Sequence, residues 1–456
     1  MSSHMKKKPS YFSFPARTIA LSFAAVILTG TLLLMLPVSS RERVFSPFLD
    51  CLFTATSATC VTGLVVYDTY THWSAFGHCV ILSLIQVGGL GLVTLASFFS
   101  VMIGKKLGLR QLHTAQESVA SIDGDVSTLL KVVILTSLVV EGAGALLLMA
   151  VFVPDFGAYG VFMAVFTSVS AFCNAGFDLL GCVEPYCSLV YYNDNPLALG
   201  TIGALIIIGG IGFIVIFDLL RYRQTRKLTL HTRVVLVATA ILILAGTALI
   251  AVCEWDNPET LGALPSTAQK LGASWFHSVT CRTAGFNSIS ISGLRDIGKI
   301  ISSVLMFIGA APGSTGGGIK CTTAAVIFMT VYSVIRGDED TTIFRRRVEK
   351  GAVYKSLAVF MLAMVAVFVT AGCIMATMQH THAVTGPDAL LESVSAFATV
   401  GLSAGVSGVA NPLVKGLLIF LMYIGRLGPV SFLLSLAMRA QSNRRAVVPD
   451  GKIQIG

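Results

Sequence analysis

Apolar residues run for about 20 positions at several points of the chain, and polar or charged residues gather between these runs. A helix needs about 20 predominantly apolar residues to cross the hydrocarbon core of a bilayer. We therefore expect a polytopic membrane protein. Four of the runs open a recurring pattern, and we expect spanning helices there at about 17–37, 129–152, 233–253 and 354–377.

Each of these spans is followed by a shorter segment that is too short and too polar to cross a membrane. These segments lie at about 47–60, 160–173, 268–281 and 388–398. A loop containing glycine comes next, and then a second apolar span, at about 75–102, 197–219, 298–334 and 412–437. The order of span, half-helix, loop and span is typical of the unit of tetrameric cation channels.

The loops themselves repeat, because the stretches FTATSATCVTGL, FTSVSAFCNAGF, FHSVTCRTAGF and ESVSAFATVGL share one pattern of small, Ser/Thr-rich residues ending near a glycine. These glycines recur every 109 to 116 residues. The sequence therefore predicts an all-α polytopic membrane protein of four fused helix–pore-helix–helix repeats. Pseudo-fourfold symmetry would arrange eight spans and four re-entrant pore helices around a central pore.

The repeats divide the chain into segments. We expect a cytoplasmic N-terminus, four pore repeats of which the third has a broken gate helix, and a C-terminal tail, at 1–16, 17–103, 128–222, 231–335, 353–438 and 439–456.

Composition and charge agree with a membrane protein. The chain is 54% hydrophobic and only 12% charged, whereas soluble domains carry roughly 25% charged residues. The net charge of +9 comes from Lys and Arg in short segments beside the spans, which is the positive-inside pattern and places both termini in the cytoplasm. This placement argues against nucleic acid as a partner. Ten cysteines show no CxxC spacing, which argues against zinc, and pairing of Cys182 with Cys187 in a predicted outer loop stays open.

The glycine loops have a chemical reason to recur in a pore. A cation that leaves water needs its hydration shell replaced, and rings of backbone carbonyls do this. Glycine reaches the backbone angles that turn carbonyls toward one axis, and a helix C-terminus aimed at the cavity favours a cation. One such loop would usually be an ordinary turn. Four at near-constant spacing favour a selectivity filter over that alternative.

At these loops the chain resembles the Trk/Ktr/HKT superfamily of potassium transporters, whose four non-identical repeats carry one glycine per filter loop. Within it the chain looks closest to Ktr-type membrane subunits, because the short segment before the first span leaves no room for the extra helix pair of Trk-type proteins. The resemblance implies a filter made of Val61, Thr62, Gly63, Asn174, Ala175, Gly176, Thr283, Ala284, Gly285, Thr399, Val400 and Gly401.

The second span of the third repeat contains GAAPGSTGGGIK, and glycine and proline both destabilise a helix interior. We expect this span to break near 310–319, whereas the other three repeats lack such a stretch. The resemblance implies an intramembrane gate below the filter; a kink in a packed helix is the alternative. The gate residues would be Gly309, Pro312, Gly313, Ser314, Thr315, Gly316, Gly317, Gly318, Lys320 and Arg426.

Ionisable residues at membrane depth are usually functional. The resemblance places Arg426 near the gate loop as a positive barrier, and Lys320 either anchors that loop to carbonyls or extends toward the interface. Arg282 is expected to brace the third filter loop. Glu141 is expected to hydrogen-bond neighbouring helices, and Glu392 to add negative potential. His380 and His382 are expected in a solvated outer loop rather than at a metal site.

These observations predict the ion-translocating subunit of a potassium uptake system that conducts K+ passively. The resemblance implies a homodimer on a cytoplasmic ring of nucleotide-binding regulatory subunits, docked through basic loops at 221–233 and 336–350. No nucleotide motif is found in this chain, and no HExxH or paired acids near the loops suggest an enzyme. Sodium remains a secondary or activating ion to test. A transporter that couples K+ to Na+ or protons is the alternative, but inverted repeats are usual there and all four repeats here run in one orientation.

Overall fold

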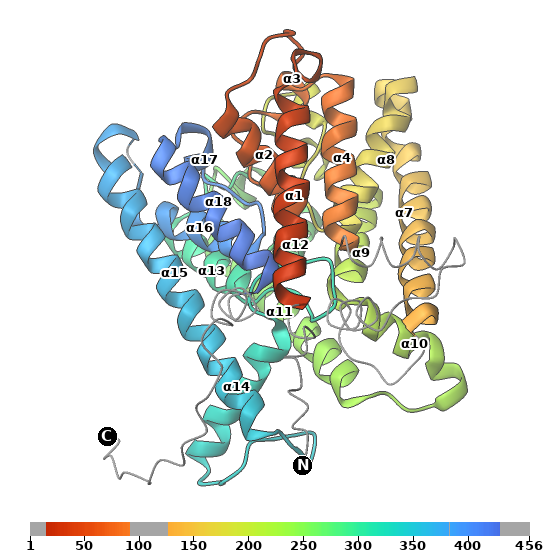
Figure 1. Cartoon of the computed structure of the whole chain (residues 1–456), viewed down its shortest axis with the longest axis vertical. Helices are drawn as coiled ribbons and strands as arrows, with labels where there is room; N and C mark the ends of the chain where they lie inside the picture. The colour runs from red at the N-terminus through yellow and green to blue at the C-terminus, as the bar shows by residue number, and fades with distance from the viewer. Residues whose placement is uncertain (1–14, 92–125, 383, 429–456) are drawn as a thin grey trace, which may run out of the picture.

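The computed structural model describes residues 15–91, 126–382 and 384–428, and these form a bundle of helices with one small hairpin (Figure 1). The tail at 439–456, most of the expected N-terminal segment and parts of the first and fourth repeats lie outside the described residues. The helices that open the four groups are α1 (Pro15–Met35), α7 (Val126–Phe156), α11 (Leu230–Glu254) and α15 (Lys350–His382).

A shorter helix follows each of these four. They are α2 (Phe48–Cys60), α8 (Ala158–Phe172), α12 (Thr267–Thr280) and α16 (Gly386–Ala398). Local sequence explains where they begin: Ser266 and Thr385 cap α12 and α16 in capping boxes with Gln269 and Asp388.

Each group then has another helix of 12 to 16 residues: α4 (Ala75–Leu90), α9 (Pro196–Ile211), α13 (Asp296–Phe307) and α18 (Pro412–Leu427). Asn195 and Asn411 cap α9 and α18, and proline stands at the first helical position of both, where its missing N–H leaves no bond unmade. The remaining elements are α3 (Thr69–His72), α10 (Phe213–Thr225), α14 (Cys321–Ile335), α17 (Val406–Val409), the 3-10 turns η1 (Pro37–Ser39), η2 (Leu180–Cys182), η3 (Val190–Tyr192) and η4 (Leu261–Ala263), and strands β1 (Thr342–Ile343) and β2 (Arg346–Arg347).

The helix contacts close into a ring. α4 contacts α8, α9 contacts α12, α13 contacts α16, and α18 returns to contact α2. The last group of helices therefore packs against the first. The short helices α2, α8, α12 and α16 lie inside this ring, because most of their side chains are buried.

Three described segments are long and apolar enough to cross a membrane, namely Lys131–Phe156, Leu230–Glu254 and Lys350–Gln379. The pair α9 and α10 counts as a fourth if it is one bent span. Helices of 15 to 17 residues, such as Ala75–Leu90, are apolar but shorter. The count of eight spans stays a prediction.

The second span of the second group differs from what we expected. Instead of one helix over 197–219, α9 and α10 meet at Gly212 with a bend of 93°. Gly212 has φ +90° and ψ 148°, a conformation outside the helical region that glycine adopts without strain. His380 and His382 also depart from expectation, because the backbone is helical through the end of α15 rather than forming a loop.

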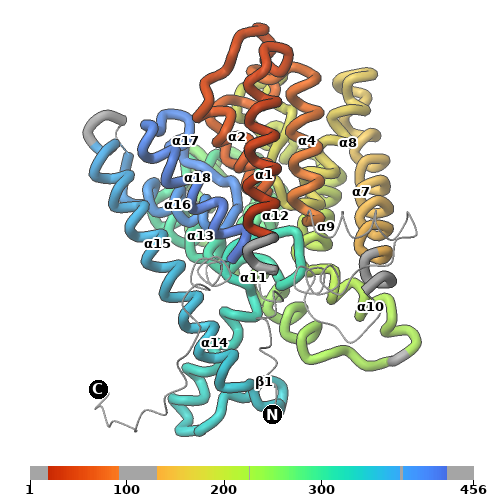
Figure 2. Tube along the Cα trace, in the orientation of Figure 1, coloured from red at the N-terminus to blue at the C-terminus, as the bar shows by residue number. Residues whose placement is uncertain are grey.

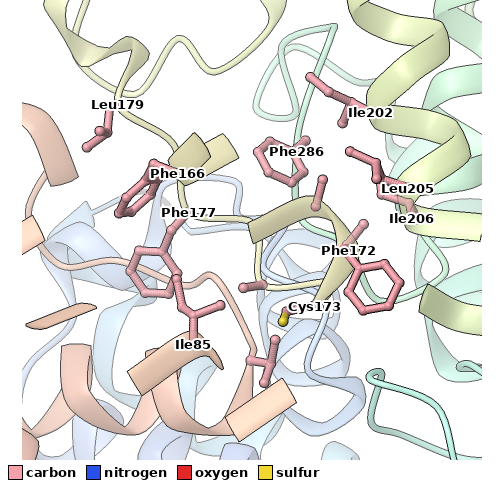
Figure 3. Packing of buried hydrophobic residues seen from close by; sticks show 14 of the residues in the cluster. Ile85, Phe166, Phe172, Cys173, Phe177, Leu179, Ile202, Leu205, Ile206 and Phe286 are labelled. Carbon is pink, nitrogen blue, oxygen red and sulfur yellow. The ribbon is translucent and has the colours of Figure 1, made fainter. Parts of the chain in front are cut away.

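The core packs where the short helices end. Phe172, the last residue of α8, lies beside Leu205 and Ile206 of α9, and Phe166 and Phe177 lie on the other side (Figure 3). All five side chains are buried. This packing fixes the end of α8, from which a glycine loop continues.

Two ion pairs connect neighbouring groups of helices at equivalent places. Lys299 of α13 contacts Asp388 of α16 at 2.8 Å, and Lys415 of α18 contacts Asp50 of α2 at 2.5 Å. Tyr67 also donates a hydrogen bond to Asp50 at 2.7 Å. The Lys415–Asp50 pair joins the last group to the first and so closes the ring.

We predict that Lys415→Met destabilises the protein by about 3 kcal/mol, because it leaves the buried Asp50 carboxylate without its cation. Thermal unfolding of the purified protein in detergent measures the change. Combining it with Asp50→Asn should recover part of the loss. Equal melting temperatures of the single variant and the parent would contradict the role of this pair in closing the ring.

Candidate functional site

Four loops follow the C-termini of α2, α8, α12 and α16, and their backbones share one conformation. The first residue of each loop has a left-handed φ, although none is glycine: the values are 58° at Val61, 58° at Asn174, 70° at Thr283 and 53° at Thr399. Such a conformation is uncommon for β-branched residues and costs on the order of 1–3 kcal/mol each. Strain at three β-branched residues, with the same conformation at Asn174 in the matched position, indicates a functional site.

The glycine two positions later also has positive φ in every loop, at 91°, 70°, 86° and 97° for Gly63, Gly176, Gly285 and Gly401. A Cβ placed on each glycine would approach the carbonyl oxygen of the next loop, and the series runs around the ring. These oxygens belong to Ala175, Ala284, Val400 and Thr62, at 2.5, 2.6, 2.4 and 2.3 Å. The four glycines therefore surround one centre, and a side chain on any of them would collide with a neighbouring loop.

Hydroxyl groups hold two of the loops. Ser57 accepts a hydrogen bond from the Gly63 N–H, and Ser395 accepts one from the Gly401 N–H, both at 3.0 Å. Between the second and third loops, the Asn174 side-chain amide lies 3.3 Å from Thr283 Oγ1. Neighbouring loops are therefore bonded as well as packed.

A cavity of about 710 Å³ opens onto all four glycines. Its lining includes the acidic side chains Asp68, Asp178 and Glu184, and no Lys or Arg of the described residues belongs to it. Asp68 accepts hydrogen bonds from the N–H groups of Thr71 at 2.8 Å and Tyr186 at 3.0 Å. The cavity thus has a negative wall that would raise the local concentration of cations.

Asp178 is the most perturbed of these acids. Burial raises its pKa to about 6, and the negative charge of Asp68 acts in the same direction. The N–H of Leu180 donates to Asp178 at 3.0 Å and opposes the rise. Nothing in the sequence pattern singled out this residue, because its neighbour Asp68 is more than 100 positions away.

On the other side of the glycines, residues 308–320 form a loop between α13 and α14. Its two ends are bonded to each other: Gly309 N–H donates to Ile319 O at 2.8 Å, and Cys321 N–H donates to Ala310 O at 3.2 Å. Ser314 donates to Ala311 O at 2.6 Å inside the loop. The segment is therefore a closed excursion from the helix and not a simple kink.

This loop packs directly against the four-glycine ring. A Cβ on Gly316 would lie 2.1 Å from Thr283 Oγ1, and a Cβ on Gly317 would lie 2.3 Å from Thr399 Oγ1. Gly318 is close to Ala398, and Thr315 donates to Phe172 O at 3.2 Å. The glycines allow this approach because larger residues would not fit.

Two cations hold the loop. Lys320 Nζ donates to the carbonyl of Gly316 at 2.7 Å, so of the two expectations for Lys320 the structure shows the carbonyl anchor. The Arg426 guanidinium donates to Thr315 O and to Gly88 O and lies 3.3 Å from Gly89 O. Arg426 therefore connects the loop to the end of α4.

The other ionisable residues have structural partners. Arg282 is 5% exposed, and its guanidinium lies close enough to the Cys321 thiol, at the start of α14, for the two groups to interact electrostatically. Gln86 donates to Glu141 at 3.1 Å, between α4 and α7. Glu392 accepts hydrogen bonds from Ser403 at 2.9 Å and from the Ser407 N–H at 3.0 Å, so it braces the segment after the fourth loop. The thiols of Cys182 and Cys187, whose pairing the sequence left open, are free in the structure.

Helices of the other three groups also end at a glycine, although we expected longer spans there, at about 75–102, 197–219 and 412–437. α4, α9 and α18 end before Gly91, Gly212 and Gly428, which have φ of 81°, 90° and 85° and ψ of 127°, 148° and 132°. Three glycines one turn of helix earlier contact the ends of the short helices: Gly88 lies against Thr59 O, Gly209 against Phe172 O and Gly425 against Phe397 O. The recurring sequences GGLG, GGIG and GRLG carry this signal.

Comparison with known proteins shows which family this chain belongs to. The family model TrkH, described as "Cation transport protein", matches residues 1–445. "Ktr system potassium uptake protein B" of Bacillus subtilis is 39% identical over 444 residues, covering 97% of each chain, and "Potassium/sodium uptake protein NtpJ" of Enterococcus hirae is 36% identical over 99% of each. The crystal structure of the potassium transporter TrkH from Vibrio parahaemolyticus has a TM-score of 0.69 at 18% identity, covering 95% of this chain and 86% of that one, and so shows the fold.

The fold and these matches define a membrane transport protein for cations, not an enzyme. More particularly, the chain belongs to the TrkH family of cation transport proteins.

Proposed function

We propose that this protein is the ion-translocating membrane subunit of a potassium uptake system and conducts K+ passively through the ring of four glycine loops. One observation carries the proposal: each loop places a carbonyl oxygen where the glycine of the loop before it would carry a side chain. Backbone oxygens converging on one centre are the chemistry that replaces the hydration shell of a cation. Two relatives that extend over almost the whole chain are named as a potassium uptake protein and a potassium/sodium uptake protein.

The filter in this proposal consists of the three residues at each loop, 61–63, 174–176, 283–285 and 399–401. The helices α2, α8, α12 and α16 act as pore helices, because each ends at the ring and brings its partly negative C-terminus there. Thr62 and Thr399 have buried hydroxyls without a hydrogen-bond partner among the described residues. Buried hydroxyls usually have partners, and an ion or water in the filter would supply one.

The loop over 308–320, with Arg426, acts as the gate. It lies on the side of the ring opposite the acidic cavity, where it would obstruct an ion that has passed the filter. The Arg426 side chain adds a positive charge to the same position. The four repeats at 17–103, 128–222, 231–335 and 353–438 then supply eight spans, with both termini in the cytoplasm of the cell whose plasma membrane holds the protein.

Regulation would come from other chains. We propose a homodimer seated on a cytoplasmic ring of nucleotide-binding subunits, docked through the basic segment 336–350. The words "Ktr system" in the names of two relatives are consistent with an assembly of several subunits. Arg345 in the turn of the β1–β2 hairpin and Arg346 at the start of β2 are exposed and suit such a contact.

Flux measurements test the function. Purified protein in liposomes should carry K+ down its gradient when the sodium and proton gradients are both zero. Uptake that requires either gradient would favour the coupled transporter. Adding Na+ at equal concentration on both sides then distinguishes an activating ion from a driving one.

The cavity predicts a dependence on external pH. The raised pKa of Asp178 means that the carboxylate becomes neutral as the external pH falls through about 6. K+ influx should therefore decrease as external pH goes from 7.5 to 5.5, because the negative wall weakens, by roughly twofold to fivefold. Asp178→Asn should show the lower influx at both values and little change between them. An unchanged pH profile in this variant would contradict the role of Asp178.

A further inference from the structure

Helix α10 differs from the other helices in direction and chemistry. The 93° bend at Gly212 turns it away from α9, toward the lower right of the view, while α9 runs along the bundle (Figure 2). If α9 crosses the membrane, α10 runs nearly parallel to the membrane surface. Its sequence, FIVIFDLLRYRQT followed by RK, changes from apolar to basic along its length.

The exposed part of α10 combines apolar and basic side chains. Leu220 is 61% exposed and Tyr222 is 46% exposed, and both are adjacent to exposed arginines. The first turns are anchored instead, since Phe213 and Val215 are buried. Exposure of Leu and Tyr side chains to water is unfavourable. At a membrane interface, these apolar groups would enter the boundary of the acyl chains, and the basic groups would reach the lipid headgroups.

The ion pairs among the described residues do not include Arg223 or Arg226 at this end of α10. Arg223 and Arg226 are exposed, and the acidic residue of the helix, Asp218, accepts hydrogen bonds from the Thr229 N–H at 3.0 Å and from Thr229 Oγ1 at 3.1 Å. Asp218 thus fixes the turn between α10 and α11. The resulting surface is cationic and complements an anionic membrane.

The start of α10 is bonded to the proposed gate. Phe213 N–H donates to Gly313 O at 3.0 Å, and Ala311 N–H donates to Gly210 O, also at 3.0 Å. A Cβ on Gly212 would lie 2.9 Å from Pro312 O. Because the two backbones run side by side, a displacement of α10 would be transmitted to the loop.

We propose that α10 is an interfacial helix that binds anionic phospholipid headgroups through Arg223 and Arg226, and that this binding holds the loop 308–320 beneath the filter. Lipid binding stabilises the conformation in which α10 is bonded to the loop, because a ligand shifts an equilibrium toward the state it binds better. Anionic lipid therefore lowers K+ flux. This second half rests on the proposed function; the interfacial position of α10 does not.

A protein partner is the competing occupant. The lipid is favoured because α10 bends 93° away from α9 and exposes the apolar side chains of Leu220 and Tyr222 together with basic ones, which is the chemistry that a membrane interface accommodates. The hairpin 341–348 also carries basic side chains, but it is a β-hairpin with a two-residue turn at Phe344 and Arg345 and not a helix that lies along the membrane surface. It therefore provides the matched control.

The position of α10 is tested without ion flux. In liposomes, the fluorescence added by Tyr222→Trp should be quenched by phospholipids brominated on their acyl chains, and quenching should increase when phosphatidylglycerol replaces part of the phosphatidylcholine. Arg223→Gln with Arg226→Gln should remove that increase. Fluorescence that brominated lipid does not quench would overturn the interfacial assignment, whatever the protein conducts.

The coupling is tested by K+ flux in vesicles of phosphatidylcholine, with and without phosphatidylglycerol. The K+ flux of the parent should be lower in the anionic vesicles than in phosphatidylcholine alone. We expect about a fivefold decrease for each contact between an arginine of α10 and a headgroup that must break before the loop opens. The Arg223→Gln, Arg226→Gln variant should lose this difference, whereas Arg345→Gln with Arg346→Gln should keep it. Equal lipid dependence in all three proteins, or its loss in both variants, would overturn the coupling. The coupling would also be overturned if the Arg223→Gln, Arg226→Gln variant kept its lipid dependence but no longer responded to a regulatory subunit. In that case α10 would be a binding site for a protein partner.

Discussion

Gly285→Ser should abolish most of the discrimination between potassium and sodium. The new Cβ would lie 2.4 Å from Val400 O, one of the four carbonyl oxygens that meet at the ring, and the position has φ +86°. Serine is strained in that conformation, so the third and fourth loops must move apart. Because replacement of the hydration shell depends on the spacing of these oxygens, we expect the permeability ratio to fall at least about tenfold. Reversal potentials under K+ and Na+ gradients measure the ratio.

Gly272→Ser is the matched control for this experiment. It lies in α12, in the same group of helices, and nothing stands within 4 Å of the position its Cβ would take. This control should keep both flux and selectivity. If Gly285→Ser folds, conducts and still discriminates like the control, the ring is not the filter.

Much of this fold could be read from the sequence because membrane helices are set by local composition. The segments expected at 47–60, 268–281 and 388–398 correspond to helices Phe48–Cys60, Thr267–Thr280 and Gly386–Ala398. Length of the apolar runs and recurrence of the glycines were sufficient for this, since both are properties of the chain itself. The family assignment followed from the same repeated loops and is shown by the comparisons.

The site's finer features depend on contacts between distant segments. The left-handed φ of Val61 and Thr283 is unfavourable locally and persists only because neighbouring loops enforce it. The bend at Gly212 could not be predicted locally, because the loop that packs against it, near Gly313, lies about 100 residues later in the chain. Arg426 looked unusual within an apolar run, but its acceptors, Thr315 O and Gly88 O, come from two other groups of helices.

The gate loop is the feature whose removal should have the largest effect on flux. Its ends are already joined, because Gly309 is bonded to Ile319 and Ala310 to Cys321. Removing 313–317 therefore leaves a short connection that the existing base can close. The deletion takes away the carbonyls that Lys320 and Arg426 hold.

We accordingly expect deletion of Gly313 to Gly317 to raise K+ flux at least about tenfold and to make it largely independent of a regulatory subunit. The magnitude follows from the charge-assisted hydrogen bonds of Lys320 and Arg426, each worth about 1.5–3 kcal/mol, that no longer hold the loop across the path. Monodisperse purification establishes that the variant folds, and flux in liposomes is compared with and without the partner.

Arg426→Gln distinguishes the obstruction by the loop itself from the effect of the guanidinium that holds the loop in place. It keeps all residues of the loop but removes the guanidinium that bonds Thr315 O and Gly88 O, so flux should rise by less than in the deletion. A loop that blocks by its own bulk would give this order, with the parent lowest, Arg426→Gln intermediate and the deletion highest. If the folded deletion variant conducts no more than the parent and still needs the partner, the loop is not a gate. The closed base of the loop would then serve packing alone.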